Sequence, residues 1–135
     1  MSSPSSAVDV AAVVIESVRP GAVRVAIEGT SYHLDLTCAA SDGLTIGRVA
    51  HGIVHGTALR LHRARAGGVF IEPVDGTPRI VQGRVLATDT HTDRILLNAV
   101  VPIWLTVPAD QAASDFTSGE LINFYLASGA SFQKA

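Results

Sequence analysis

Apolar and polar residues alternate along much of this chain. The segment AVRVAIEG places Val23, Val25 and Ile27 on one phase and mostly charged or small residues on the other. A period of two is typical of a strand with one buried face. The segment SYHLDLT repeats the pattern, with Leu34 and Leu36 in the apolar phase, after the turn-forming residues EGTS. The sequence therefore predicts two half-buried strands joined by a tight turn.

Further strands are predicted where Val, Ile and Leu cluster between turn-forming residues: 11–18, 69–73, 79–89, 94–108 and 120–132. Residues 48–63 contain Gly52 and Gly56, each of which costs a helix about 1 kcal/mol relative to alanine. This segment therefore predicts two strands or one bent strand. Residues 109–119 fit one short helix, and the pattern as a whole predicts an all-β fold.

The two halves of the chain match each other. Thr45 and Gly47 in LTIG correspond to Thr117 and Gly119 in FTSG, 72 positions later. The other matched residues are apolar or glycine: Leu34 with Leu105, Leu36 with Val107, Val49 with Leu121, Ile53 with Tyr125, Gly56 with Gly129 and Leu59 with Phe132. Internal duplication of a small barrel-forming unit explains this correspondence. The alternative is that any two β-meanders share glycine turns and alternating apolar residues.

Each half has the outline of an OB-fold, which has about five strands and a loop or short helix between the third and fourth. We therefore predict two fused OB-like β-barrel units produced by an internal duplication. The expected organisation is a flexible N-terminal tail at 1–10, a first OB-like repeat at 11–66, a connector with a short strand at 67–78 and a second OB-like repeat at 79–135.

Composition narrows the class of protein. Only 16% of the residues are charged, against about 25% in typical globular domains, which favours a homo-oligomer that buries surface between copies. The chain contains no run of about 18 apolar residues, which argues against a membrane span. The net charge of −2 gives no general attraction for nucleic acid. The single Cys38 excludes an intrachain disulfide, and the first residues lack the pattern of a signal peptide, so we expect a cytoplasmic protein.

The segments GAVRVAIEG, YHLDLT and LTIGRVAHGIVHGTALRL together resemble the Mop/TOBE type of OB repeat, and the likeness recurs once per half. The resemblance implies a tandem pair of OB units that forms oligomers and binds an oxyanion such as molybdate between units. Members of the family carry a Lys-Ala-Ser/Thr step just before the last strand, where the lysine and the hydroxyl meet the anion. The matching positions here read HGT at 55–57 and SGAS at 128–131, so the lysine is absent from both halves.

Candidate anion ligands at these positions are Thr57, Ser128, Gly129 and Ser131. Hydroxyl groups and a glycine amide can donate hydrogen bonds to an anion, and backbone amides around glycine form concave anion sites. Ser-Gly is equally common in turns. Apart from an oxyanion, no cofactor is expected.

A basic segment, RLHRAR, contains Arg60, Arg63 and Arg65. Arginine suits bidentate contact with phosphate, so a phosphate or nucleic-acid contact is one interpretation. The other is a charged edge strand that discourages pairing with other strands. Binding of single strands also needs exposed aromatic platforms, and the chain has only four Phe, two Tyr and one Trp. Nucleic acid is therefore not the expected partner.

Metal and catalytic sites are not expected either. His51 and His55 lie four residues apart, which on a strand separates them by about 13 Å, too far for one zinc ion. Cys38 near His33 would suit a nucleophile, but a lone cysteine is more often a buried apolar residue. The motifs of phosphate loops, α/β-hydrolases and zinc proteases do not occur. We expect no enzyme activity.

The segment AVVPIWLTVP does not alternate cleanly, which predicts a strand buried on both faces. Pro102 marks a bulge, a strand end or an edge. One face is expected to meet the barrel core and the other to meet the second unit or another subunit. The predicted interface residues are Val101, Ile103 and Trp104, with Trp104 as the anchor.

The sequence thus favours a non-enzymatic structural or protein-interaction module that self-assembles through apolar barrel surfaces. Its expected partner is another copy, or a different protein. Binding of a small oxyanion or metabolite in the manner of the Mop/TOBE family is the alternative. A nucleic-acid-binding OB module is the second alternative.

Overall fold

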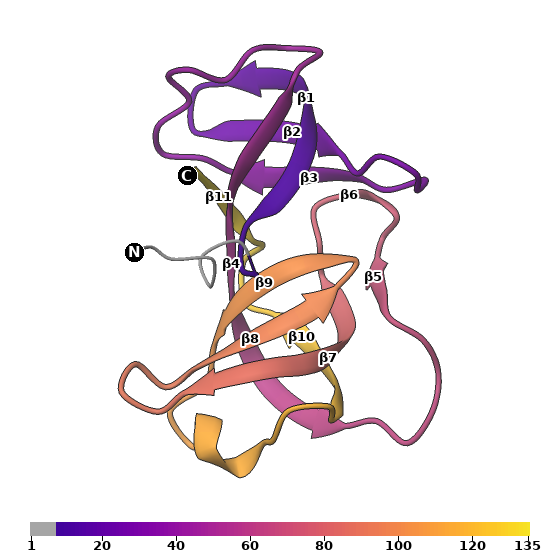
Figure 1. Ribbon diagram of the computed structural model, residues 1–135, viewed down its shortest axis with the longest axis vertical. Coiled ribbons are helices and arrows are strands. Elements are labelled where there is room, and N and C mark those ends of the chain that lie inside the picture. Colours follow the sequence, from indigo (N-terminus) through magenta and orange to yellow (C-terminus); the bar gives the residue numbers. More distant parts are fainter. Residues whose placement is uncertain (1–7) are drawn as a thin grey trace.

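The structure, a computed structural model, describes residues 8–135. It is a mostly β protein with 54% strand, and the strands form one large mixed sheet (Figure 1). The described residues contain no α-helix, and a 3-10 turn at Ala113–Asp115 is the short helix expected within 109–119. They accordingly include no helix with the length and apolar character needed to cross a membrane. The predicted all-β class is confirmed at this level.

The sheet contains 11 strands. They are β1 (Ala11–Arg19), β2 (Ala22–Ala26), β3 (His33–Thr37), β4 (Val49–Arg63), β5 (Phe70–Glu72), β6 (Asp75–Gly76), β7 (Ile80–Asp89), β8 (Arg94–Ala99), β9 (Val101–Thr106), β10 (Leu121–Leu126) and β11 (Ser131–Lys134).

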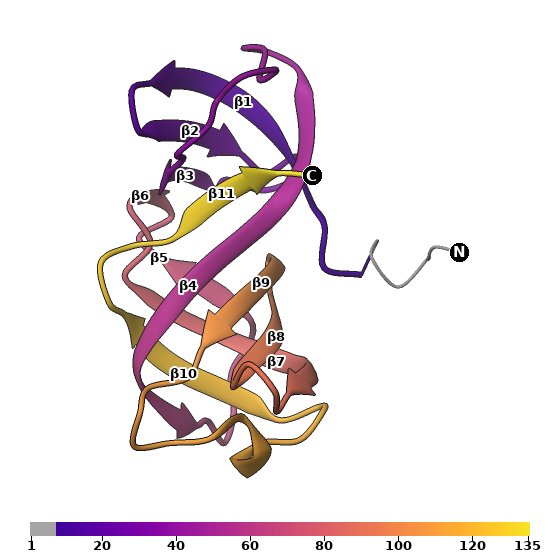
Figure 2. The ribbon, with the colours of Figure 1, turned by 90° about the vertical axis from the view of Figure 1, so that its left-hand side faces the viewer.

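β4 is one continuous strand of 15 residues that runs along most of the molecule (Figure 2). Other strands approach it closely at its two glycines. A Cβ on Gly56 would lie 2.7 Å from Cδ2 of Leu126, and a Cβ on Gly52 would meet the ring of Phe132. The glycines that argue against a helix therefore permit close packing on this strand.

The first half of β4 belongs to a group with β1, β2, β3 and β11. The pairings run β1–β2, β2–β3, β3–β11, β11–β4 and β4–β1, and so return to the starting strand. Only β3–β11 is parallel. The register of β1 shifts after Ile15, which accepts a backbone hydrogen bond from Gly47 N–H (2.7 Å) and donates one to Arg48 O (3.0 Å).

The second half of β4 belongs to a group with β7, β8, β9 and β10. The pairings run β7–β8, β8–β9, β9–β4, β4–β10 and β10–β7, and again return to the starting strand. Only β9–β4 is parallel. The register of β7 shifts after Val85, which accepts from Gly119 N–H (2.8 Å) and donates to Glu120 O (2.9 Å).

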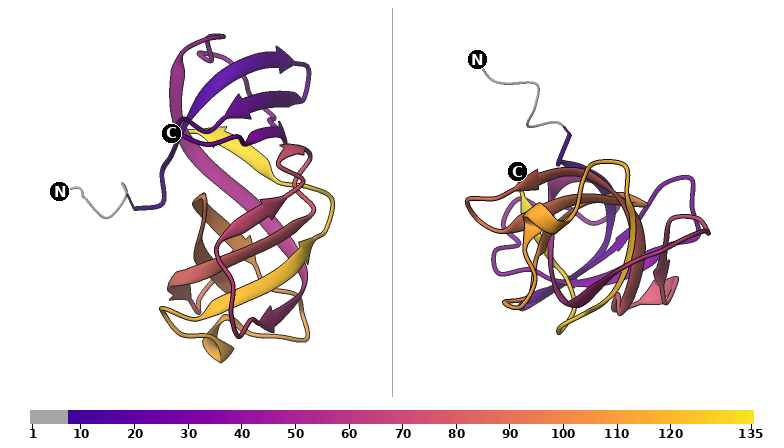
Figure 3. Two further views of the ribbon diagram at one scale, coloured as in Figure 1. Left: turned by 90° about the vertical axis from the view of Figure 1, so that its right-hand side faces the viewer. Right: turned by 90° about the horizontal axis from the view of Figure 1, so that it is seen from below.

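The two groups lie one beyond the other along the long axis of the molecule (Figure 3). β11 follows β10 in the chain but pairs in the first group, whereas the second half of β4 pairs in the second group. Strand pairing therefore crosses between the predicted repeats at 11–66 and 79–135, whose boundaries stay predictions. Residues 1–7 of the predicted tail lie outside the described residues.

The strand that we predicted at 94–108 is a hairpin of β8 and β9, and AVVPIWLTVP contains only the last residue of β8, the turn and β9. β8 and β9 are antiparallel, Ala99 pairs with Val101, and Val100 at the turn has a φ of 70°. Valine is rarely found at positive φ, so the sequence carries no ordinary turn signal there. The apolar pattern is irregular because the chain reverses direction at Val100 and because β8 buries three consecutive residues, Ile95, Leu96 and Leu97. β9 itself alternates between buried residues and half-buried or exposed ones, so it is not buried on both faces as we predicted.

Large, fully buried side chains come from both groups and belong to one hydrophobic cluster. Examples are Ile15, Val25 and Phe132 in the first group and Ile95, Leu97 and Phe124 in the second. The predicted inward phase of β3 is confirmed, because Leu34 and Leu36 are buried.

Candidate functional site

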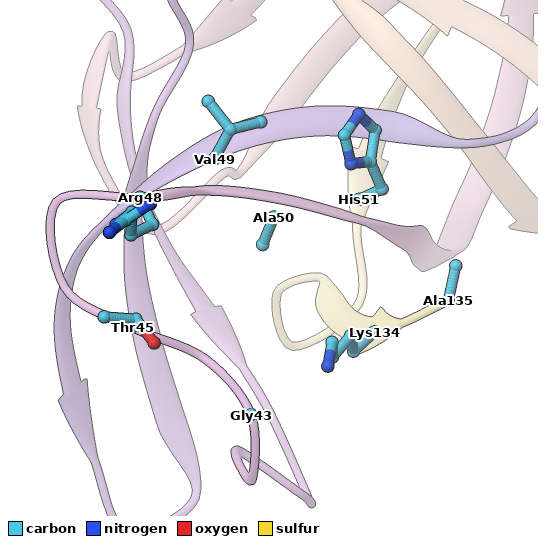
Figure 4. Close-up of a pocket in the computed structure, with 8 residues that line it drawn as sticks. All are labelled: Gly43, Thr45, Arg48, Val49, Ala50, His51, Lys134 and Ala135. Atoms are coloured by element: carbon cyan, nitrogen blue, oxygen red, sulfur yellow. The ribbon is translucent and has the colours of Figure 1, made fainter.

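A hollow of about 480 Å³ lies beside the beginning of β4 (Figure 4). Its lining comes from three segments: the loop before β4, the first residues of β4 and the end of β11. The side chains with hydrogen-bonding or charged groups are Thr45, Arg48, His51 and Lys134. Residues far apart in the sequence meet here because β11 pairs antiparallel with β4, with Lys134 opposite Gly52.

Gly43 allows the Lys134 side chain to reach across this hollow. Gly43 has a φ of 84°, and a Cβ built on it would lie 2.6 Å from Nζ of Lys134. Any larger residue would therefore displace the amine or strain the loop. Figure 4 shows the Lys134 amine directed toward the loop that carries Gly43 and Thr45, while the His51 ring points away from it.

The charged side chains that line this hollow are basic. Neither Arg48 nor Lys134 forms an ion pair with any residue in the described range 8–135. No aspartate or glutamate is among the lining residues, although the exposed Asp42 lies in the same loop. Arg48 and Lys134, together with the Thr45 hydroxyl, provide donors for an anionic group.

The structure distributes the four predicted anion ligands over different places. Ser128 and Gly129, both at positive φ, line a smaller hollow of about 150 Å³ together with Arg19. Ser131 lines a separate hollow of about 290 Å³. Thr57 is exposed on β4, where its carbonyl accepts a hydrogen bond from the residue before Ser128, at 2.8 Å. Only Ser128 and Gly129 therefore lie together.

The predicted interface residues lie on two faces of β9. Val101 and Ile103 are 5% and 3% exposed and pack in the core of the chain itself. Trp104 points to the other face and is half-buried; its Nε1 donates a hydrogen bond to Oδ2 of Asp9 (2.9 Å). The Arg94 guanidinium lies 4.5 Å from the centre of the Trp104 ring. This face of β9 is thus covered in part by residues of the same chain.

His55 lies beside Trp104 in the register of β4 and β9. Burial, and then the positive charge of Arg94, lower the pKa of His55, while Asp9 opposes this shift. Oδ1 of Asp9 is buried and has no hydrogen-bond partner within the part of the chain that the structure describes. The group is a polar cluster at the junction of the two strand groups.

Carboxylates compensate most of the predicted basic patch. Arg60 forms an ion pair with Asp110 (2.6 Å), and Arg63 forms one with Glu120 (2.7 Å). A hydrogen bond from the Thr117 backbone, followed by the contact with Arg63, lowers the pKa of Glu120. Of the three arginines, only Arg65 has no ion pair with a residue of the described segment.

The remaining candidates are separated from one another. Cys38 is 2% exposed, and its Sγ lies 3.4 Å from the carbonyl oxygen of Ala40. His33 instead contacts Glu16, with 2.9 Å between Nδ1 and Oε1. Within residues 8–135, no three His, Cys, Asp or Glu side chains form a group suited to a metal ion.

The hollow at Arg48 and Lys134 was not found from the sequence. Lys134 lies 86 positions after Arg48, and only the pairing of β11 with β4 brings them together. The pattern of apolar and polar residues within one β-strand does not predict which distant strand it pairs with. No family model matches this chain, and no curated protein matches it either.

Proposed function

We propose that the sheet consists of two interlocked five-stranded barrels of the OB type, derived from an internal duplication. The support is that both groups of strands have the same order of pairing, with a single parallel contact between the third and fifth strands. In this proposal each unit receives its fifth strand from the other half of the chain: β11 in the first and the second half of β4 in the second.

Equivalent local details support the duplication. The first strand of each group is irregular at the same point, after Ile15 and after Val85. At that point each strand makes two backbone hydrogen bonds with a Thr-x-Gly loop and the residue after it. The partners are Gly47 and Arg48 in the first group, and Gly119 and Glu120 in the second. Gly47 and Gly119, which match in the sequence 72 positions apart, make the same contact in the two groups.

We propose that the protein binds a small anion in the hollow at the beginning of β4. The observation that carries this proposal is that Arg48 and Lys134, both without ion pairs in the described chain, line one hollow that has no acidic side chain in its lining. The Thr45 hydroxyl adds a donor. Charge-assisted hydrogen bonds from arginine and lysine are the strong contacts by which proteins hold oxyanions and carboxylates.

Isothermal titration calorimetry with phosphate, sulfate, molybdate and a dicarboxylate tests this proposal. We expect at least one of these anions to bind, and the affinity to fall as the salt concentration rises. Arg48→Ala and Lys134→Ala should each weaken binding about tenfold or more, since a lost charge-assisted contact costs about 1.5–3 kcal/mol.

Arg65→Ala is the matched control, because Arg65 is also without an ion pair in the described chain but does not line this hollow. The Arg65→Ala variant should bind the anion with the same affinity as the unmodified protein. Absence of binding by all four anions at low salt would contradict the proposal. Loss of binding in Thr57→Ala or Ser131→Ala, with Lys134→Ala unaffected, would place the site at the positions suggested by the Mop/TOBE resemblance.

Assembly is the second candidate function. The specific observation is that several large apolar side chains remain exposed, among them Leu59 on β4 and Tyr125 on β10. A non-enzymatic module that associates with itself or another protein would cover them.

A further inference from the structure

The outer face of the second strand group carries an apolar patch formed by Leu59, Ile80 and Tyr125. Tyr125 on β10 pairs directly with Ile80 on β7. On its other side, Tyr125 lies opposite the stretch of β4 that contains Leu59, because Phe124 pairs with Leu61 and Leu126 with Ala58. Tyr125 is 56% exposed and Leu59 is 61% exposed, so two of the largest exposed apolar side chains lie on neighbouring strands.

A hollow of about 420 Å³ adjoins this patch. Its lining includes Tyr125 and Ile80 together with Pro73, Glu72 and Arg79. Mixed apolar and aromatic lining of this kind is common at protein interfaces, where tyrosine and arginine are enriched. The hollow is thus suited to receive a side chain from another surface.

Two opposite charges, those of Glu72 and Arg79, flank the hollow. The backbone N–H of Arg79 donates to the carbonyl of Glu72 (2.8 Å), so the two residues are neighbours. Nevertheless, neither side chain forms an ion pair with any part of the chain from residue 8 onward. By contrast, Arg24, Arg60 and Arg63 are all paired with carboxylates.

We propose that this patch is a self-association surface that binds a second copy of the chain around a two-fold axis. In such a contact the same surface faces itself, so each attractive feature must be matched by its complement on that surface. The patch meets this condition, because Arg79 of each copy can pair with Glu72 of the other copy, which gives two equivalent ion pairs. Tyr125 of each copy then enters the hollow of its partner. This inference rests on assembly, the second proposed function, and is independent of the proposed anion site, which lies in the other strand group.

A second copy fits this surface better than a nucleic acid does. The patch carries one positive and one negative side chain, whereas a nucleic-acid surface needs an excess of positive charge. The whole chain has a net charge of −2. The interface that we predicted on β9 is less accessible, because Val101 and Ile103 are buried in the core.

Sedimentation velocity of the full chain over a range of concentrations tests the proposal. We expect reversible dimers. Tyr125→Ala, Arg79→Glu and Glu72→Arg should each raise the dimer dissociation constant about tenfold or more. The double variant Arg79→Glu/Glu72→Arg should dimerise more tightly than either single variant, because it restores opposite charges across the axis.

Ile46→Ser is the control, since Ile46 is also exposed but lies in the loop before β4, away from the patch. It should dimerise like the unmodified protein, and circular dichroism should show that all variants are folded. A chain that is monomeric at all concentrations would mean that the patch serves another partner or ligand, and would overturn the proposal. A double variant no tighter than the single variants, or a dimer lost only in Trp104→Ala, would overturn it as well.

Discussion

His55 lies in a polar cluster whose charges are unevenly matched. Arg94 stacks on the neighbouring Trp104, and Asp9 accepts a hydrogen bond from that tryptophan with one oxygen while its other oxygen is buried without a described partner. A buried carboxylate oxygen without a donor costs free energy. The hydrogen bond from Trp104 to Asp9 therefore holds the start of the described chain against β9, but burial of the second Asp9 oxygen costs free energy. The net charge of the cluster depends on whether His55 is protonated.

The pKa of His55 predicts how stability depends on pH. Burial and Arg94 lower this pKa in the folded chain below the ordinary value of 6.5. As the pH falls below about 6.5, the unfolded chain therefore takes up this proton before the folded chain does, and the free energy of unfolding decreases. The contribution of His55 is fully present above that pH, and its loss is complete once the pH has fallen below the folded pKa.

Urea unfolding at pH 7, 6 and 5 measures this dependence. We expect His55→Gln to lose less stability between pH 7 and pH 5 than the unmodified protein does. His51→Gln serves as the control, because His51 is exposed on the same strand. If the free energy of unfolding changes equally with pH in His55→Gln and in the unmodified protein, His55 does not contribute to the pH dependence.

At the scale of single elements, β4 depends on glycine where β11 crosses it. A Cβ on Gly52 would lie 2.6 Å from the backbone oxygen of Gln133 and would also meet the ring of Phe132. Backbone cannot move aside as a flexible side chain can. We therefore expect Gly52→Ala to lower the free energy of unfolding by about 1–3 kcal/mol, which is the usual cost of overpacking.

Gly68→Ala is a matched control for that substitution. No atom lies within 4 Å of a Cβ built on Gly68, and its φ is not positive. Chemical denaturation should show a change of no more than about 0.5 kcal/mol for this variant. If Gly52→Ala is equally neutral, β11 does not pack on β4 as closely as the structure indicates.

The alternation of apolar residues was enough to predict the strands and their buried phases, as in β2 and β3. The alternation did not predict features that no local residue pattern marks. Val100 turns the chain at positive φ without the glycine or asparagine that marks such turns. Likewise the pairing of β11 with the first half of β4 joins segments about 80 residues apart, and local patterns contain no information on which distant edge a strand selects.

The candidate site shows the same limit. The sequence indicated an anion through hydroxyl residues and a family resemblance, but the arginine and lysine of the hollow belong to the loop before β4 and to β11. Arg48 and Lys134 are ordinary surface residues when they are viewed separately. Their combination depends on the non-local pairing that the pattern did not contain.

At the scale of the whole molecule, β4 pairs in both groups and β11 pairs in the first, which predicts that the two groups unfold together. Phe132 on β11 is almost fully buried, and β11 is connected directly to β10 of the other group. We expect Phe132→Ala to cost about 3–5 kcal/mol, the usual range for truncating a buried phenylalanine. The free energy of unfolding should decrease in both groups of strands, although Phe132 packs in the first.

Hydrogen exchange measures this coupling. The slowest amides of β2 and of β8 should have equal free energies of opening in the unmodified protein, and both should fall by the same amount in Phe132→Ala. The exposed substitution Leu86→Ala on β7 should change neither by more than about 0.5 kcal/mol. Separate transitions for the two groups would contradict the prediction.

The position of β11 also has a consequence during synthesis on the ribosome. The strands β1 to β4 emerge first, but the group to which they belong is completed only by β11, which is translated after every strand of the second group. Until then the edges of β3 and β4 that β11 will cover are open, and such edges can pair with other nascent chains. The second group has all of its strands once β10 has emerged, so it can complete its pairing before the first group does, although most of the first group is translated earlier.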